Sequence, residues 1–351
     1  MTFIDTIERG EPRRLARFLY SVLLALALFC SAGNARADGC TVTMNDVNFG
    51  AVSPLSTSDI IVSTTGTVNC SWNLLSPTPP FLVVFPNVSA CVNIGLGDGS
   101  ITAATRTLSN GSAKLQYNLY RDASTTPATI AGATTVPSAS IPILSVLTVP
   151  SLLLGGSISQ PFTVWGKIPA GAALAAVPTV GNADTNYVSS FVGHATLSYA
   201  FYNLIKPDCT SGQSASFAFT VRARVVNDCK ISTSPLSFGT VGTLTAAVRS
   251  TSAVSVQCVN NNAYQIVLNG GSVANNVGAR KMRSAAGGQI AYQLSPTLDG
   301  ALWGDGTLGT ALWSAIGTGI PVNVPMFGMV PVQATPAPGD YRDTVTATVV
   351  F

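Results

Sequence analysis

A duplicated cysteine frame constrains this chain more than any other feature of its sequence. Residues 40–70 and 229–258 each begin and end with cysteine, and each has a Phe-Gly pair nine residues after its first cysteine, at Phe49 and Phe238. Because further landmarks recur in the same order, we interpret the chain as two copies of one domain. They are an apolar-x-Tyr-x-Leu segment (115–119 and 290–294), an aromatic-Gly pair (165–166 and 327–328) and a closing strand (195–201 and 345–351).

Short alternating segments predict that each copy is all-β. Apolar and polar residues alternate with a period of two in the closing strands, and Gly, Pro and Asn separate such segments along the chain. Beyond residue 40 we find no long stretch with helical periodicity. Charged residues make up 9% of the chain, whereas soluble domains usually have about a quarter. These features favour a secreted all-β protein.

The first 37 residues have the pattern of a cleaved signal peptide. A basic segment at 13–17 precedes an apolar core at 19–29, which is too short to span a bilayer. An Ala-x-Ala site at 35–37 then predicts that the mature chain begins at Asp38. We therefore expect the protein to be exported.

Six cysteines follow the predicted cleavage site, and an even number in an exported chain predicts three disulfides. They are Cys40, Cys70, Cys91, Cys209, Cys229 and Cys258. Six cysteines allow 15 pairings, so their number alone does not assign partners. The repeat predicts that Cys40 pairs with Cys70 and that Cys229 pairs with Cys258. Cys91 and Cys209 then pair by elimination.

Charge and residue types argue against several classes of function. After residue 37 the chain has 13 basic and 12 acidic residues, a balance that predicts no binding to nucleic acid. His194 is the only histidine, and no nucleophile setting accompanies it, so a catalytic triad is not expected. With the cysteines assigned to disulfides, we expect no metal site, no cofactor and no enzyme activity.

The segment that joins the two copies has the pattern of a strand. Within residues 214–226, apolar side chains alternate with Ser, Thr and Arg. From position alone, this segment serves the first domain, the second or both. Its apolar positions are Phe217, Phe219, Val221, Ala223 and Val225.

Three apolar insertions lengthen the first copy. They lie within residues 76–87, 141–156 and 167–181, where the first copy exceeds the second by 14, 13 and 12 residues. Because loops are normally polar, apolar loops predict a partner surface. The alternative is that 81–85 and 143–149 are core strands. The candidate contacts are Phe81, Leu82, Val83, Val84, Phe85, Leu144, Val146, Leu147, Leu152, Leu153, Leu154, Leu174, Val177 and Val180.

Four motifs of this chain belong together: the Cys…Phe-Gly…Cys opening, the Tyr-centred segment, Trp303-Gly304 and the ending Gly-Asp-Tyr-Arg-Asp-Thr-Val at 339–345. Together they resemble the spore coat protein U family, which includes subunits of archaic chaperone–usher pili. The second copy matches closely over 229–351, whereas the first keeps an aromatic residue at Phe191 but lacks the preceding Gly-Asp. A chain with two such copies is similar to the tip adhesin of such a pilus.

The resemblance implies two immunoglobulin-like β-sandwiches of the pilin type. The expected layout is a signal peptide (1–37), an adhesin domain with the three insertions (38–210), a linker (211–228) and a pilin domain (229–351). Pilin domains of this family lack their last strand, and a donor strand fills the resulting groove. We predict that the linker completes the first domain in cis.

For the second domain, the resemblance implies completion in trans. A periplasmic chaperone would fill the groove first, and a neighbouring pilin would replace it at the outer-membrane usher. We expect the groove edge to comprise Val345, Ala347, Val349 and Phe351. Only two residues, Asp38 and Gly39, would precede Cys40 in the mature chain, which leaves no donor strand and predicts a place at the pilus tip on the cell surface.

The leading expectation is therefore a tip adhesin that binds abiotic or host surfaces through apolar loops. One alternative is a subunit that binds a specific glycan or protein, with Trp165 and Tyr187 stacking on a sugar. The strand position of Trp165 favours a core role instead. The other alternative is a structural minor pilin or coat subunit.

Overall fold

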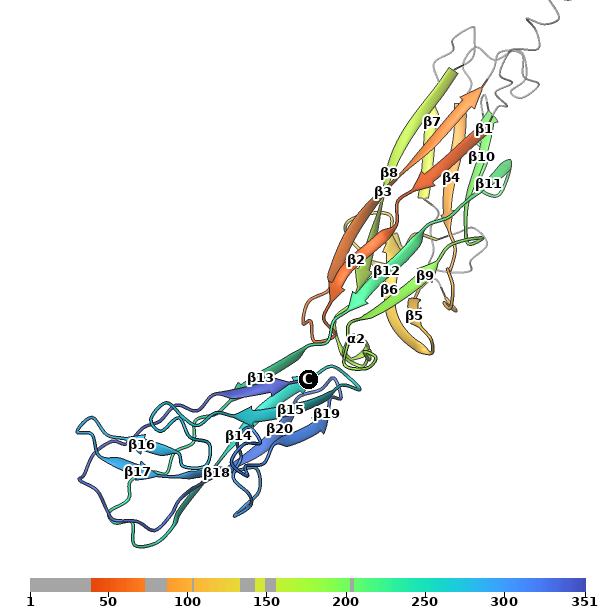
Figure 1. Ribbon diagram of the computed structural model, residues 1–351. Helices are drawn as coiled ribbons and strands as arrows, with labels where there is room; N and C mark the ends of the chain where they lie inside the picture. Colours follow the sequence, from red (N-terminus) through yellow and green to blue (C-terminus); the bar gives the residue numbers. More distant parts are fainter. Residues whose placement is uncertain (1–38, 73–86, 103, 133–142, 149–155, 203–204) are drawn as a thin grey trace, which may run out of the picture.

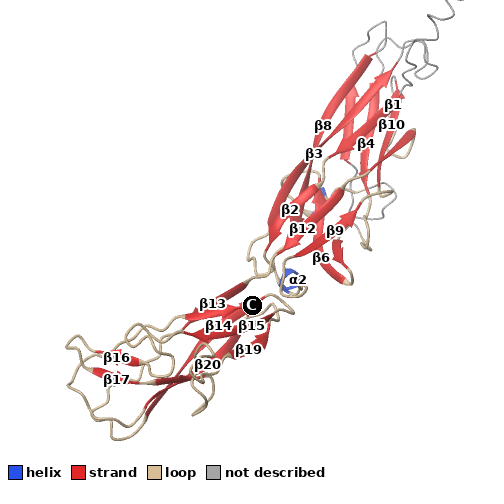
Figure 2. Cartoon of the chain, viewed as in Figure 1, coloured by secondary structure: helices blue, strands red, loops and turns tan. Residues whose placement is uncertain are grey.

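The protein consists of two β-sandwich domains joined end to end (Figure 1). The computed structural model describes all residues except 1–38, 73–86, 103, 133–142, 149–155 and 203–204. Nearly all of the regular structure is strand, as Figure 2 shows, so the predicted all-β fold is confirmed. No helix in these described ranges is both long and apolar enough to cross a membrane.

The first domain packs an eight-stranded sheet against a four-stranded one. Its core lies between the two sheets and includes residues that alternate along the strands. In spatial order the large sheet is β1 (Gly39–Met44), β3 (Ile60–Trp72), β8 (Gly156–Ile168), β6 (Ala113–Tyr120), β5 (Arg106–Asn110), β9 (Thr185–Ser190), β12 (Thr220–Val225) and β2 (Val47–Val52). The small sheet is β11 (Gln213–Phe217), β10 (Ala195–Tyr202), β4 (Asn87–Ile94) and β7 (Ile143–Thr148).

The second domain repeats this plan with shorter strands. One of its sheets contains β13 (Cys229–Thr233), β14 (Val248–Cys258), β20 (Val322–Val330) and β18 (Gln293–Ser295). The other contains β19 (Trp313–Ile316), β15 (Ala263–Leu268) and β21 (Ala347–Val350). A hairpin of β16 (Lys281–Arg283) and β17 (Gln289–Ala291) lies beside them. Trp303 is fully buried in the core, and its indole N–H donates to the carbonyl of Ile266 at 2.9 Å.

The three predicted disulfides are confirmed. Cys40–Cys70 joins directly opposed residues of β1 and β3, and Cys229–Cys258 does the same for β13 and β14. The third, between Cys91 and Cys209, connects β4 to the chain just before the linker strand β11. It therefore anchors the start of the linker to the first domain.

Each domain also contains a buried arginine that the sequence reasoning missed. Arg106 donates through Nη2 and Nε to the carbonyls of Ile94 and Gly95, at 2.9 and 3.0 Å. In the second domain Arg280 makes the same two bonds at the end of β15, at 3.2 and 2.8 Å. Burial lowers the pKa of Arg106 to about 10, so its side chain remains charged at neutral pH. The equal spacing of these arginines from their strands could have revealed them in the duplicated sequence.

The third apolar insertion lies at the junction between the domains and is not an exposed adhesive loop. It forms the short helix α2 (Ala172–Ala175), beside the second domain in Figure 1. The prediction that Leu174 and Val177 contact a surface is wrong, because they are 2% and 1% exposed in the core of the first domain. Only Val180, at 60% exposure, is accessible.

Hydrogen bonds connect this insertion to the second domain. Thr179 and Asn262 are both fully buried, and the Thr179 hydroxyl donates to the Asn262 side-chain carbonyl. Asn182 and Ala263 exchange two bonds of 3.2 and 3.0 Å, and Asn260 donates to the carbonyl of Ala176. The insertion therefore holds the two domains together.

Candidate functional site: the groove at the edge of each domain

In the first domain the linker fills a groove between the two sheets. β11 pairs with β10 in antiparallel register, with Phe217 opposite Ala195. The chain then crosses to the large sheet, where β12 pairs antiparallel with β9 and parallel with β2. One continuous segment thus closes both sheets of the first domain.

The apolar face of the linker points into the core of this domain. Its five alternating apolar side chains are between 0% and 8% exposed. The ring of Phe219 stacks on Phe191 with centroids 4.3 Å apart, and Phe217 follows at 6.0 Å. Position along the sequence left open which domain the segment serves, whereas these contacts are all with the first domain.

In the described part of the chain, no such strand fills the corresponding position in the second domain. Among the described residues, β21 is the last strand of its sheet and pairs only with β15. Val345, Ala347 and Val349 are only half-buried, and Phe351 is 53% exposed. The counterparts of the first three, in β10, are between 0% and 8% exposed. Apolar core side chains therefore remain accessible along this edge.

The groove of the second domain has a second wall, which the sequence reasoning missed. Residues 236–241 align with β2 through the shared Phe-Gly pair, but they form no strand. Val52 is fully buried under β12, whereas its counterpart Val241 is 41% exposed. Leu236 and Phe238 are partly buried and pack against the core. The Phe-Gly alignment contained the signal, because it places these residues where β2 meets the linker.

Tyr292 lies in the core of the second domain and is held by an aspartate of the ending motif. Its hydroxyl donates to Asp343 Oδ2 at 2.6 Å, and burial followed by this bond raises the Tyr292 pKa. Asp343 also accepts from the backbone N–H of Ser272 at 2.8 Å. In the first domain burial raises the pKa of the equivalent Tyr117 to about 12. Asp343 thus holds the chain in place just before β21.

The first two apolar insertions start from the end of the first domain that is far from the second. Trp72 and Gly156 are paired, as are Asn87 and Thr148, and these four strand ends lie at that far end in Figure 1. Candidates 81–85 and 152–154 fall outside the described residues. Leu144, Val146 and Leu147 belong to β7, which is an edge strand paired with β4 and not a loop.

The two aromatic residues considered for sugar stacking do not form one site. Tyr187 is fully buried, and its hydroxyl donates to the carbonyl of Pro178 at 2.7 Å. The core role favoured for Trp165 is wrong, since the alternation of β8 places it on the outer face, half-buried, while Val164 is buried. The residue of the neighbouring strand β3 that is paired with Trp165 is Ser63.

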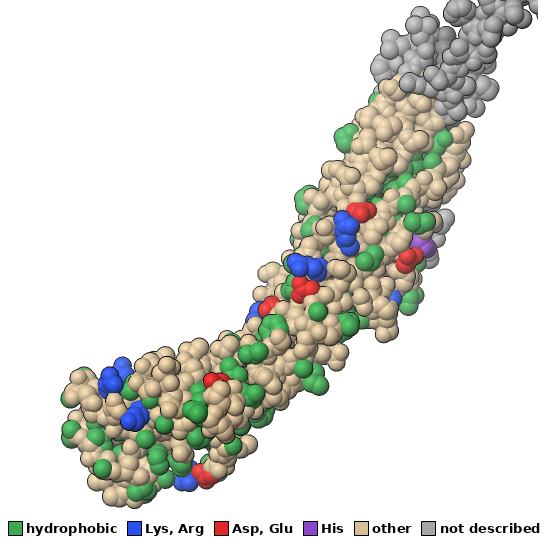
Figure 3. All heavy atoms as spheres, viewed as in Figure 1, with side chains coloured by type: hydrophobic (Ala, Val, Ile, Leu, Met, Phe, Trp, Pro, Cys, Tyr) green, Lys and Arg blue, Asp and Glu red, His purple; other side chains and the backbone are tan. Residues whose placement is uncertain are grey.

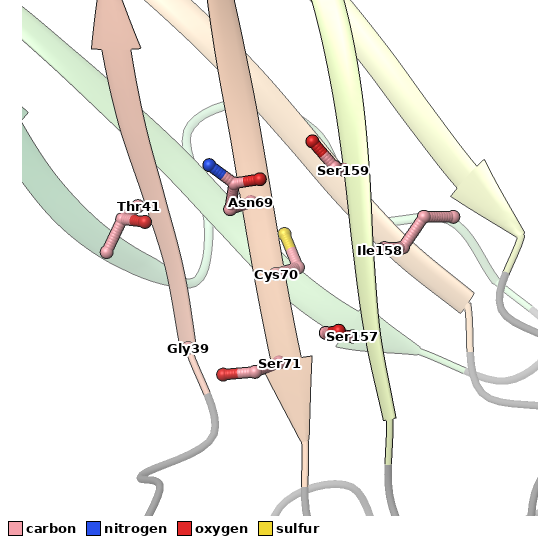
Figure 4. Close-up of a pocket in the computed structure, with 8 residues that line it drawn as sticks. All are labelled: Gly39, Thr41, Asn69, Cys70, Ser71, Ser157, Ile158 and Ser159. Atoms are coloured by element: carbon pink, nitrogen blue, oxygen red, sulfur yellow. The ribbon is translucent and has the colours of Figure 1, made fainter.

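A hollow of about 570 Å³ lies on the outer face of β1, β3 and β8 at the same far end (Figure 4). Among the described residues that line it, none has a charged side chain. The hydroxyl and amide groups around it come from Thr41, Asn69, Ser71, Ser157 and Ser159. Such a surface can exchange hydrogen bonds with a neutral ligand.

The described residues contain no group of three or more His, Cys, Asp or Glu that could hold a metal ion. His194 lies at the surface, where its Nε2 is 3.6 Å from Asp98 Oδ1.

Comparison with known proteins identifies the family. The family model "Spore Coat Protein U domain" matches residues 25–182 and 215–348. The chain belongs to the spore coat protein U domain family. The two matches cover the two copies, the second beginning within the linker, so the resemblance found in the motifs is confirmed. No match was found among curated proteins.

Solved structures of adhesive pilus subunits are similar at low identity. The chaperone–tip adhesion subunit complex of archaic chaperone-usher Csu pili of Acinetobacter baumannii is 16% identical with a TM-score of 0.47, covering 89% of this chain and 100% of that one. The adhesive subunit of CFA/I fimbria of enterotoxigenic Escherichia coli is 12% identical with a TM-score of 0.29, covering 89% and 93%.

Proposed function

We propose that this chain is the tip adhesin of a chaperone–usher pilus, held in the fibre by a strand that a neighbouring subunit inserts into its second domain. The observation that carries the proposal is the presence of two copies of one fold, with the same groove filled in one and open in the other. The first domain therefore provides a template for the second domain after strand addition.

An inserted strand would pair the free backbone edge of the open groove and cover its exposed apolar side chains. An exposed edge beside apolar core residues favours pairing with another strand and, without one, aggregation. Main-chain bonds to β21 would supply affinity, and alternate side chains would fill the groove. Each apolar side chain that becomes fully buried contributes about 1.5–3 kcal/mol before the costs of association. These needs support a periplasmic chaperone as the first partner and a neighbouring pilin, assembled at the outer-membrane usher, as the second.

The adhesive surface is assigned to the far end of the first domain. Two strongly apolar segments, 81–85 and 152–154, connect strands whose ends lie there. With the opposite end of the domain occupied by the second domain, the far end is free to meet a surface. We assign contact with abiotic or host surfaces to these two segments, and exclude the third insertion.

One observation favours a second candidate, a subunit that binds a specific glycan. The uncharged hollow at the far end offers hydroxyl and amide groups that match those of a neutral sugar. In this case Asn69→Ala would abolish binding to a glycan array, and adhesion to bare plastic would be unaffected.

The test of the leading proposal is adhesion to bare hydrophobic plastic by cells that display the pilus. We expect Phe81→Ser, Phe85→Ser and Leu153→Ser in combination to abolish adhesion at normal surface pilus levels, because they remove apolar contacts at the far end. Val180→Ser is the matched control, since it removes an exposed apolar side chain at the other end of the domain. Undiminished adhesion by the triple variant would refute the assignment of the adhesive surface.

A further inference from the structure

The outward face of the linker strand is basic, and the segments beside its groove in the first domain carry acidic residues of matching charge. The outward side chains Arg222 and Arg224 of β12 are exposed, and each lies close to an aspartate on an adjacent segment of the same chain. Arg222 Nη1 lies 3.7 Å from Asp46 Oδ2, and Arg224 Nη1 lies 2.8 Å from Asp184 Oδ2. Asp46 also accepts from the backbone N–H of Thr220 at 2.9 Å. A basic strand is thus paired with an acidic rim.

The rim of the second groove lacks these acids. Counted from the first cysteine of each copy, Pro235 occupies the position of Asp46. In the first domain Ser109 lies opposite Val188, and in the second its counterpart Arg283 lies opposite Arg342, so that Pro338 occupies the position of Asp184. Asp340, two residues further on, is already paired with Arg342. A basic strand placed in the second groove would therefore lose both of its ion-pair partners.

The second domain carries extra cations two strands away from this rim. The alignment of Arg106 with Arg280 places Lys281 and Arg283 at the positions of two neutral residues, Thr107 and Ser109. Both cations are exposed on the same face of β16, and neither makes an ion pair within the part of the chain that the structure describes.

Arg342, on an adjacent segment of the same chain, adds to this cluster. Arg283 forms an antiparallel bridge with Arg342, so the two like charges lie side by side. Arg342 pairs with Asp340, which leaves a net charge of +2 over the four groups. On the face drawn in Figure 3, blue and red side chains are neighbours along the first domain, and the blue side chains at the left end of the second domain have no red ones beside them on that face.

The fold places these cations within reach of an inserted strand. In the first domain β5 lies beside β9, and β9 lies beside the linker strand β12. Two strand spacings amount to about 10 Å, which is well within the Debye length of about 30 Å at 0.01 M salt and slightly beyond that of about 8 Å at physiological ionic strength, so the effect is strongest at low salt. Lys281 and Arg283, on the counterpart of β5, would therefore act on the outward face of a strand in the second groove.

We propose that the charges beside the groove of the second domain determine which donor strand can bind there. The second groove selects a donor strand whose outward side chains are acidic, and it disfavours the basic linker strand that fills the first. The inference rests on the proposed function, because it assumes that a strand enters the groove. A repulsive element against the wrong strand adds to specificity beyond attraction of the right one.

The test is a competition between two peptides for the intact mature chain. One peptide has the sequence of residues 213–226, and the other carries Arg222→Glu and Arg224→Glu. The chain is refolded with its disulfides formed in an equal mixture of the two at about 10 μM, well below the millimolar effective concentration that keeps the linker in the first groove. Mass spectrometry then gives the ratio of bound peptides.

We expect the acidic peptide to be bound at least about fivefold more than the basic one at low salt, with the ratio approaching one in 1 M salt. Lys281→Glu with Arg283→Glu should reverse the preference. The matched control is Lys114→Glu with Lys206→Glu, which makes the same change in charge on exposed lysines of the first domain and should leave the ratio unaltered.

The possible outcomes distinguish failure of strand insertion from failure of charge selection. If neither peptide binds, the groove does not accept a strand and the proposed function fails with it. If both peptides bind equally at low salt, or if Lys281→Glu with Arg283→Glu keeps the original ratio, the groove accepts a strand but selection by charge is refuted.

Discussion

Replacing Phe219 by alanine tests most directly whether the linker is a structural part of the first domain. The ring is 4% exposed and lies between Phe191 and Phe217, with centroids 4.3 and 6.0 Å away. Phe-to-Ala changes at such buried sites cost about 3–5 kcal/mol, because transfer free energy is lost and a cavity remains. We expect Phe219→Ala to lower the stability of the first domain by this amount.

Hydrogen exchange followed by mass spectrometry is the suitable assay, because it reports on each domain separately. Peptides from β4 and β10 should exchange more readily in Phe219→Ala, whereas those from β14 and β20 should be unchanged. A double-mutant cycle with Phe191→Ala should give a coupling of about 1 kcal/mol from the stacked pair.

The matched control is Thr220→Ala, which truncates a neighbouring side chain with partial exposure. A surface change of this kind should cost less than about 0.5 kcal/mol. If Phe219→Ala lowers the free energy of opening in the first domain by less than 1 kcal/mol, or if protection is lost in the second domain instead, the linker does not complete the first domain.

Three further predictions follow from buried polar groups. Arg106→Met should destabilise the first domain by about 3–5 kcal/mol in denaturant unfolding, because it leaves the carbonyls of a buried strand end unsatisfied. Asn262→Ala should leave both domains folded but broaden the interdomain distance distribution in spin-label measurements, because it removes the buried bond to Thr179; an unchanged distribution would mean that other contacts hold the junction. Tyr117 ionises in the unfolded chain near pH 10 and in the folded chain only near pH 12, so the unfolded state loses its proton first and stability should fall by roughly 1.4 kcal/mol per pH unit between these values. Tyr117→Phe should remove that part of the alkaline loss, and an identical pH profile would contradict the assignment.

Much of the fold could be predicted because its determinants are local or repeated. Period-two alternation indicated the strands, and the duplicated Cys…Phe-Gly frame indicated two copies and two of the disulfides. The alternation in the linker identified its apolar face without reference to any partner.

The candidate site was predicted only in part, for a physical reason. Leu174 and Val177 lie in a stretch that resembles an apolar loop, yet they are buried. An exposed apolar loop and a loop that covers a core have the same composition, and only tertiary packing distinguishes them. The wall at Leu236 and Phe238 was missed because β2 pairs with the linker in parallel across about 175 residues of sequence.

Local patterns along the chain were enough to predict two related β domains, six paired cysteines and a two-faced strand between the copies. The three-dimensional structure was needed to show that this strand belongs to the first domain, that the third insertion joins the domains, and that Asp46 and Asp184 face its arginines. The reason is that alternation and spacing are properties of neighbouring residues. Which groove a strand fills, and which charges lie across from it, depends on pairings between segments that are far apart in the chain.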